Sequence, residues 1–529
     1  MRNISLEKIL WVFQKVMLAM FVALLLVQAF ATLDWRMEHD TPTLYYQAFL
    51  MNKYHMIPYR DFWETSMPGA LAFDYIIGKL FGYGDVAFRC VDLTLLCALL
   101  VATFVFMSRF GRLAAAWAAI LFGLLYFSKG QTMSLQRDYI GIIPIAFALL
   151  CIPTQTGRNV PLWRFALVGL LFGISVLVKP HLGLGLPIVF GTLLAFRWLA
   201  QRKSSLDLLR CATVCGISLL SPVLIALFWL AVNSALAPFL YIFLKYFPLY
   251  SVLTGWAENV SGSYRIFYLI EHTLKFGGYV PLLLCSFFAY YLILAHAGTD
   301  QATVISLLCL GLCTLAYAVY PTLAGKFWEY HYMPLAYFCA LSAALCLFPR
   351  RGSQPCTVRF QYAIQEALPV LVFVIAITVQ LSLPRFALSL YTDLRTGPEI
   401  HAPKSGRVDE IAGWLRSKLQ PGDTVQALDW TGGSIHAMLL VEAKPATQFL
   451  FDYYFYHHVS SPVIQDIRRS FMHQLRAAQP RFIIEVDTNK PWVSGIDCTT
   501  SFPELREFLD SCYAVTFIGD GYLIHKRIE

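Results

Sequence analysis

Residues 9–33 read ILWVFQKVMLAMFVALLLVQAFATL, and this stretch decides the class of fold. It contains one charged side chain, Lys15, and exceeds the roughly 20 apolar residues that a helix needs to cross a bilayer. It is too long for the apolar region of a secretory signal peptide, and no small-residue cleavage site follows it. We therefore interpret it as a first membrane span that the protein retains.

Apolar stretches recur along the chain. Of its 529 residues, 57% are hydrophobic and 14% are charged, whereas soluble domains carry about 25% charged residues. Lys179-Pro180-His181 alone separates two of the stretches, so these two can also form one re-entrant feature. The further candidate spans lie near 85–107, 112–127, 138–152, 163–178, 182–199, 208–232, 277–297, 302–322, 331–348 and 367–388. The pattern predicts a polytopic α-helical membrane protein with about eleven transmembrane helices in a lipid bilayer.

The distribution of Lys and Arg predicts the orientation. If the N-terminus is cytoplasmic, these residues are about twice as dense in the cytoplasmic loops as in the opposite ones. The net charge of +8 therefore reflects membrane topology and indicates no nucleic-acid partner. An odd number of spans places the region from residue 390 onward outside the cytoplasm, and a miscount of one span would reverse that. The outer loops 34–84 and 233–276 stay outside in either case.

We accordingly divide the chain into a membrane module, 1–389, and a soluble α/β domain, 390–529. The second region alternates between helical and strand patterns, which is typical of a small α/β domain. Helices are predicted at 406–419, 461–478 and 504–510, and strands at 424–428, 481–486, 514–518 and 522–526. It contains no Gly-x-Gly-x-x-Gly and no Walker motif, so no nucleotide signature is present. In the first outer loop, Tyr45 to Tyr54 reads as an amphipathic helix on the membrane surface.

The cysteines and histidines of the C-terminal region indicate no metal site. Cys498 and Cys512 either pair in an oxidising compartment or remain unpaired thiols. The doublet His457-His458 has no partner at metal-ligand spacing, so we expect it not to bind a metal.

Charged and polar residues gather where the predicted spans end on the outer side. Because polar groups at membrane depth are costly, they first suggest a function. They are Glu38 and Asp40 after the first span, Arg137 and Asp138 at the fourth, Lys179 and His181 between the fifth and sixth, and Lys326, Glu329, Tyr330 and His331 before the tenth. If these connections converge, they form one acidic and basic site at the level of the lipid headgroups. Such a site suits a lipid phosphate, with a carboxylate as general base and Arg, Lys and Tyr around the phosphate.

Each of these residues also has a purely structural interpretation. Asp40 can be a solvated helix end, and Arg137 with Asp138 can be a helix cap with an interfacial anchor. His331 can belong to an interfacial aromatic belt that includes Trp328 and Tyr332.

The order of these features resembles the GT-C superfamily of membrane glycosyltransferases. A first span is followed by an acidic outer loop, Pro68-Gly69, an apolar helix that ends at Phe81-Gly82, and then Arg89 in the next span. The stretch 326–341, with Tyr-His-Tyr-Met-Pro-Leu at its centre, is similar to the start of a late span in those enzymes. Within the superfamily, the chain is similar to the bacterial relatives of protein O-mannosyltransferases and to the lipid A aminoarabinose transferases.

The resemblance implies an enzyme that moves a sugar from a polyprenyl-phosphate donor to an acceptor outside the cytoplasm. Asp40 matches the place of the catalytic base, and Glu38 is the second choice. Arg137, Lys326 and Arg60, in falling order, match the basic residue that contacts the carrier phosphate.

The chain departs from the family in two places. It has Glu-His-Asp at 38–40 where the protein mannosyltransferases have Asp-Glu, which leaves open which carboxylate acts. It has Trp-Glu-Thr-Ser-Met-Pro-Gly at 63–69 where many relatives have Lys-Pro-Pro, which leaves open how this loop holds the phosphate. Metal use varies among these enzymes, so the sequence predicts no particular cofactor, although a divalent metal is compatible with it.

Two other classes of protein compete with a glycosyltransferase of a bacterial inner membrane. A secondary transporter fits the number of spans, but transporters place charges near the bilayer midplane, and these spans are nearly free of charge at their centres. A non-catalytic scaffold or flippase partner in envelope assembly would tolerate neutralisation of the outer carboxylates. The acceptor, whether glycan, lipid or protein, is not encoded in a readable motif.

Overall fold

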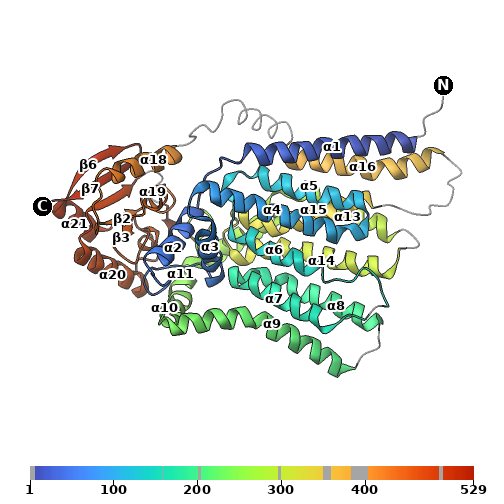
Figure 1. Cartoon of the computed structure of the whole chain (residues 1–529), viewed down its shortest axis with the longest axis horizontal. Helices are drawn as coiled ribbons and strands as arrows, with labels where there is room; N and C mark the ends of the chain where they lie inside the picture. The colour runs from blue at the N-terminus through green and yellow to red at the C-terminus, as the bar shows by residue number, and fades with distance from the viewer. Residues whose placement is uncertain are drawn as a thin grey trace.

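The computed structural model describes residues 6–157, 159–200, 204–295, 299–348, 359–382, 403–487 and 492–528. Long helices run side by side in one elongated bundle, and a sheet-containing region lies at one end of that bundle (Figure 1). Short helices of the outer loops lie between the two parts.

Every predicted span contains a helix. The helices are α1 (Leu6–Ala31), α4 (Asp85–Met107), α5 (Arg112–Ser128), α6 (Arg137–Leu149), α7 (Leu162–Val178), α8 (Leu186–Ala200), α9 (Ser205–Val232), α13 (Val280–Leu294), α14 (Gln301–Ala324), α15 (Met333–Ala344) and α16 (Arg359–Leu381). Lys179 and a short 3-10 helix, Pro180–Gly185, separate α7 from α8, so these two form distinct helices.

The predicted count of eleven spans is not confirmed. Within the described ranges, six helices are long and apolar enough to cross a membrane: Val12–Ala31, Asp85–Phe110, Pro180–Ala200, Ser205–Val232, Gln301–Ala324 and Glu329–Leu347. A seventh candidate is the pair Gly262–Gly278 and Val280–Leu294, which is bent by 73°. Arg112–Ser128, Leu162–Val178 and Ala367–Leu381 are apolar but shorter. The chain is therefore a multi-pass membrane protein in which helices of several lengths share one bundle.

The bundle has a buried centre and an apolar outer surface. Residues 333–346 of α15 and its continuation are all buried, which places this helix at the centre. In contrast, α1 and α9 expose large apolar side chains such as Phe30, Ile225 and Phe228. In water such a surface would be a liability, but it is what a lipid-facing helix requires.

Two glycines explain how closely α7 and α9 pack. Gly169 and Gly173 are one helical turn apart, and a Cβ atom on either would lie within 2.4 Å of a backbone oxygen of Cys215 or Leu219. Small residues at this spacing let two membrane helices approach each other, because little else drives their association in lipid.

The outer loops form short helices that support the sheet-containing region. They are α2 (Thr41–Lys53), α3 (Pro68–Phe81), α10 (Leu236–Tyr241), α11 (Phe247–Ser251) and α12 (Gly262–Leu274). The predicted helix around Tyr45 to Tyr54 exists, but its predicted place on the membrane surface is wrong. Residues 41–50 of α2 are all buried, and the Tyr46 hydroxyl donates to the carbonyl of Ala443 at 2.7 Å. The C-terminal region covers the face that the pattern had suggested for lipid.

The C-terminal region is the predicted α/β arrangement. Its five-stranded sheet has the order β3-β2-β4-β7-β6, in which β2 pairs parallel with β3 and β4, and β7 pairs antiparallel with β4 and β6. The predicted elements correspond to α18 (Pro403–Arg416), β2 (Thr424–Leu428), α20 (Pro462–Ala478), β4 (Phe482–Val486), α21 (Pro503–Cys512), β6 (Tyr513–Gly519) and β7 (Tyr522–Arg527). The short α19 (Ser434–Leu440) and β3 (Lys444–Pro445) were not predicted.

Two further predictions concern the C-terminal region. Cys498 and Cys512 are free thiols, so the disulfide alternative is not realised. The predicted boundary between residues 389 and 390 lies outside the described residues.

The C-terminal region docks on the outer loops through main-chain pairing and aromatic packing. Strand β1 (Glu258–Asn259) of the second outer loop pairs parallel with β5 (Ser494–Gly495). The backbone N–H of Trp63 donates to the carbonyl of Gln448 at 2.8 Å. The Trp63 ring is 5.6 Å from the rings of both Phe449 and Tyr246, and the residue is buried.

We expect Trp63→Ala to lower the free energy of unfolding by about 3–5 kcal/mol, because a buried indole is removed from a rigid aromatic cluster. The measurement is the Tm of the purified protein in detergent. Trp163→Ala is the matched control, since Trp163 is 57% exposed on α7. Equal Tm values for the two variants would contradict the assignment of Trp63 to the docking interface.

Candidate functional site

A cavity of about 260 Å³ lies where the bundle, the outer loops and the C-terminal region meet. Its wall is built from segments far apart in sequence, which only the fold brings together. The polar and aromatic lining includes Asp40, Glu64 and Ser66 of the first outer loop, Arg137 at the start of α6, Lys179 and His181 between α7 and α8, Tyr250 of α11, Lys326, Trp328 and His331 after α14, and Trp430, Tyr453 and Tyr454 of the C-terminal region. The structure thus brings Asp40, Arg137, Lys179, His181, Lys326 and His331 to one cavity.

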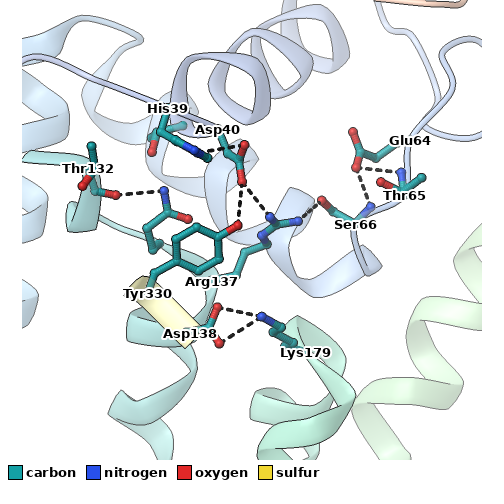
Figure 2. Close-up of polar contacts among 12 residues, drawn as sticks. His39, Asp40, Glu64, Thr65, Ser66, Thr132, Arg137, Asp138, Lys179 and Tyr330 are labelled. Carbon is teal, nitrogen blue, oxygen red and sulfur yellow. Dashed lines mark hydrogen bonds and ion pairs between the residues drawn. The ribbon is translucent and has the colours of Figure 1, made fainter. Parts of the chain in front are cut away.

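Asp40 presents a carboxylate that is held by fixed partners. It precedes α2, and its side chain is 14% exposed. Its Oδ2 accepts a hydrogen bond from Arg137 Nη2 at 3.0 Å and one from the Tyr330 hydroxyl at 3.4 Å, and His39 Nδ1 lies 3.1 Å from Oδ1 (Figure 2). A carboxylate that is oriented in this way at a cavity wall can accept a proton from a hydroxyl placed in the cavity.

Arg137 links the two parts of the first outer loop. Besides Asp40, its guanidinium donates from Nη1 to the Ser66 hydroxyl at 2.7 Å. Within the described part of the chain, its buried Nε has no hydrogen-bond partner. A guanidinium with a donor to spare, beside a cavity, is suited to a phosphate.

Glu64 is a cavity carboxylate that the sequence did not reveal. It is 3% exposed and accepts hydrogen bonds from the backbone N–H groups of Thr65, at 2.7 Å, and Ser66, and from the side chain of Gln47. These bonds shape the loop that carries Ser66 to Arg137 (Figure 2). In the sequence, Glu64 was visible only as an acidic residue five positions before Gly69, in the stretch that departs from the family. Nothing in the local sequence indicated that it lines the same cavity as Asp40.

Asp138 lies behind the cavity wall. It is fully buried and accepts from Lys179 Nζ at 2.9 and 2.8 Å and from the Tyr320 hydroxyl. Lys179 itself lines the cavity. Burial lowers the pKa of Lys179, and the charge of Asp138 opposes that shift. Asp138 therefore positions a cavity lysine and favours its charged form.

Lys326 adds a third basic side chain to the wall. Its Nζ donates to the carbonyl of Tyr250 at 2.9 Å and lies 4.0 Å from the centre of the Tyr250 ring. Burial lowers the pKa of Lys326 well below its ordinary value, and the nearby Arg265 charge lowers it further. An anion bound in the cavity would favour the charged form of this lysine.

Three of the predicted site residues lie elsewhere. Glu38 lines a separate cavity of about 20 Å³. Arg60 pairs with Asp61 at 2.8 Å, away from the lining. The Glu329 side chain is 63% exposed and lies 3.6 Å from Lys129 Nζ. None of the three lines the cavity that contains Asp40.

The described residues contain no group of three or more His, Cys, Asp or Glu side chains arranged to hold a metal ion. The Nε2 atom of His457 is hydrogen-bonded to the Tyr246 hydroxyl at 3.1 Å, and its Nδ1 atom is hydrogen-bonded to Nδ1 of His458 at 2.9 Å. Burial lowers the pKa of His457 to about 3, so it is neutral at physiological pH and joins the C-terminal region to the second outer loop.

Comparison with solved structures identifies the fold. ArnT of Cupriavidus metallidurans, bound to undecaprenyl phosphate, aligns over 96% of this chain and 98% of its own length, with 14% sequence identity and a TM-score of 0.58. Its apo state aligns over 97% and 98%, with 15% identity and a TM-score of 0.54. No protein-family model and no curated protein matches the chain. ArnT is a lipid A aminoarabinose transferase with the GT-C fold, so the resemblance to that superfamily is confirmed as a likeness of fold over nearly the whole chain.

Proposed function

We propose that this chain, which has the GT-C fold, is a membrane glycosyltransferase that moves a hexose or pentose from a polyprenyl-phosphate donor to an acceptor hydroxyl or amine in cell-envelope synthesis. The observation that carries the proposal is the cavity in which one oriented carboxylate, Asp40, shares the wall with three basic side chains, Arg137, Lys179 and Lys326. The donor class rests on the likeness to ArnT, whose solved structure holds undecaprenyl phosphate.

The residues suggest a single displacement. Asp40 takes the proton of the acceptor group while the acceptor oxygen or nitrogen attacks the anomeric carbon of the donor sugar. The bond from that carbon to the phosphate oxygen breaks, and the polyprenyl phosphate leaves with its electron pair. Arg137, Lys179 and Lys326 stabilise the growing negative charge on the phosphate. Attack opposite the leaving group inverts the anomeric centre. Glu38 is the second candidate for the base, and its separate cavity makes it the weaker one.

The other predicted site residues have supporting or distal roles in the proposal. Tyr330 orients Asp40, Asp138 orients Lys179, and His181 and His331 contribute to the wall. Glu329 and Arg60 lie away from the cavity, where they can meet only a distal part of a substrate.

We propose that the cavity faces the periplasm of a bacterium. In this arrangement, about eleven helices cross the inner membrane, the N-terminus is cytoplasmic and the C-terminal domain is periplasmic. The positive-inside distribution of Lys and Arg supports it. The outer loops and the sheet-containing region share one end of the bundle, as expected if both lie on one side of the membrane (Figure 1).

The main alternative is a secondary transporter. Transporter sites lie near the bilayer midplane, between repeats. Here the charged cavity lies at the ends of α7 and α14 and is covered by the C-terminal region. That placement favours chemistry at a membrane surface over passage through the bundle. A non-catalytic scaffold in envelope assembly has no need of an oriented carboxylate.

The test is sugar transfer by the purified protein. Reconstituted wild type is incubated with radiolabelled polyprenyl-phosphate sugars, one at a time, and a bacterial membrane extract; vesicles without protein are the control. We expect one donor to deliver label to a component of the extract. Failure of every donor, together with uptake of a labelled solute into the vesicles, would replace this proposal with the transporter.

The lowered pKa of Lys326 predicts a pH dependence of donor binding. A phosphate binds the charged form, so binding is strongest below the lowered pKa of the free protein. Above that pKa, each added pH unit lowers the affinity up to about tenfold, because Lys326 must take up a proton when the phosphate binds. Lys326→Arg should flatten this dependence, since arginine stays charged. The measurement is a titration with polyprenyl phosphate at several pH values, and equal pH profiles for the two proteins would exclude Lys326 as a phosphate contact.

A further inference from the structure

The C-terminal region contains a second cavity, of about 350 Å³. It lies at the carboxyl ends of β2 and β4, since Leu428 ends β2 and Glu485 is near the end of β4. The first parallel strand, β2, lies between β3 and β4. The chain therefore leaves β2 toward β3 on one side, and leaves β4 toward the opposite side of the sheet. Open α/β sheets bind their ligands in the crevice at this point of the sheet.

The lining of this cavity combines aromatic rings with hydrogen-bonding groups. Trp492 and Tyr456 form an aromatic wall, with ring centres 6.3 Å apart. Glu485 accepts from Arg506 at 2.6 and 3.3 Å and pairs with His525 at 3.0 Å. The buried Asp452 accepts from the Tyr456 hydroxyl at 3.4 Å. An apolar face and several polar groups that converge on one space are typical of a small-molecule site.

The charges in the lining select the ligand class. Among the described residues of the lining, Asp452 and Glu485 outnumber the one cation, Arg506, and Arg506 is already neutralised by Glu485. A phosphate or another anion would be repelled. A neutral polyhydroxylated ring fits, because its C–H face packs on an aromatic ring and its hydroxyls donate to carboxylates.

A row of aromatic rings connects this cavity with the cavity that contains Asp40, which we call the reaction cavity. The Trp328 ring, in the wall of the reaction cavity, is 6.4 Å from Trp430. The Trp430 ring is in turn 6.4 Å from Trp492. Aromatic rings in such a row offer successive faces on which the C–H faces of sugar rings can pack.

From this geometry we infer that the cavity at the carboxyl ends of β2 and β4 binds a neutral saccharide unit of the acceptor, and that the aromatic row leads the glycan to the reaction cavity. The inference rests on the proposed function and deepens it, because it names a glycan as the class of acceptor. Trp492 and Tyr456 would stack on the sugar, and Asp452 and Glu485 would bond its hydroxyls.

The test is binding of saccharides in the absence of any donor, so that it does not depend on transfer. The full-length protein in nanodiscs is titrated by saturation-transfer NMR with neutral trisaccharides of hexose and N-acetylhexosamine. We expect at least one to bind the wild type saturably. Trp492→Ala removes the stacking ring, and Thr500→Trp fills the mouth of the cavity from an exposed position. Both should weaken binding at least about tenfold.

Two variants complete the experiment. Trp163→Ala changes an exposed tryptophan on the bundle, and Asp466→Asn changes an exposed aspartate of α20 that lines neither cavity; both should bind the saccharide as the wild type does. If no trisaccharide binds the wild type, or if Trp492→Ala and Thr500→Trp bind it unchanged, the inference is overturned. Binding that is intact in a protein with no transfer activity would instead overturn the proposed function alone.

Discussion

Asp40→Asn is expected to reduce sugar transfer about 100- to 10,000-fold with little change in stability. The substitution keeps the size of the side chain and an oxygen that can accept from Arg137 and Tyr330, so the wall of the cavity should persist. It removes the proton acceptor, and loss of a positioned general base costs factors of this order. The measurement is the initial rate of label transfer at saturating donor, with the Tm of each protein recorded alongside.

The control for this variant is Asp466→Asn, an exposed aspartate on α20 that lines neither cavity. Glu38→Gln distinguishes the two candidate carboxylates, and we expect it to transfer far better than Asp40→Asn because Glu38 lines a separate cavity. A protein that carries both Asp40→Asn and Glu38→Gln and still transfers sugar at the wild-type rate would exclude this region as the source of the base.

The second large effect concerns the pair of Asp138 and Lys179. Asp138→Asn leaves Lys179 without a counter-charge in a buried place, and breaking such a pair costs about 3–5 kcal/mol. We expect a correspondingly lower Tm in detergent. Replacing both partners with apolar residues, Asp138→Leu with Lys179→Met, should recover much of that loss, because no buried charge then remains.

This double variant also separates stability from function. If Lys179 holds the donor phosphate, the protein should remain folded but bind polyprenyl phosphate more weakly than wild type. A double variant that is as unstable as Asp138→Asn would show that packing, not charge, accounts for the effect. Wild-type affinity for the phosphate in the recovered protein would remove Lys179 from the proposed site.

Most of the secondary structure was predictable because local patterns specify it. Each apolar stretch, such as 85–107, became a helix, since a backbone in lipid must satisfy its own hydrogen bonds. The alternation at 424–428 and 481–486 likewise yielded the parallel strands β2 and β4. The short β3 was not predictable, because its two residues pair only through the neighbour that the fold supplies.

The number of spans was less well determined than the number of helices. Apolar composition identified the helices, but several of them, such as Leu162–Val178, are shorter than a simple crossing requires. For α2 the same pattern gave a wrong location: its residues 41–50 are all buried, because it packs on α3 and α4 as well as on α19 of the C-terminal region. Hydrophobic periodicity indicates that one face of a helix is buried, but it does not indicate whether lipid or another part of the protein covers that face.

The sequence by itself determined the class of the fold, its helices and the types of residue that follow the helix ends, because hydrophobicity and charge act locally along the chain. Only the tertiary structure decided which of those residues meet. It placed Asp40 on Arg137, 97 positions away, brought Glu64 into the same wall and left Glu38, Arg60 and Glu329 outside. The physical reason is that a site of this kind is made where helix ends converge, and the directions of those ends are set by packing across the whole bundle.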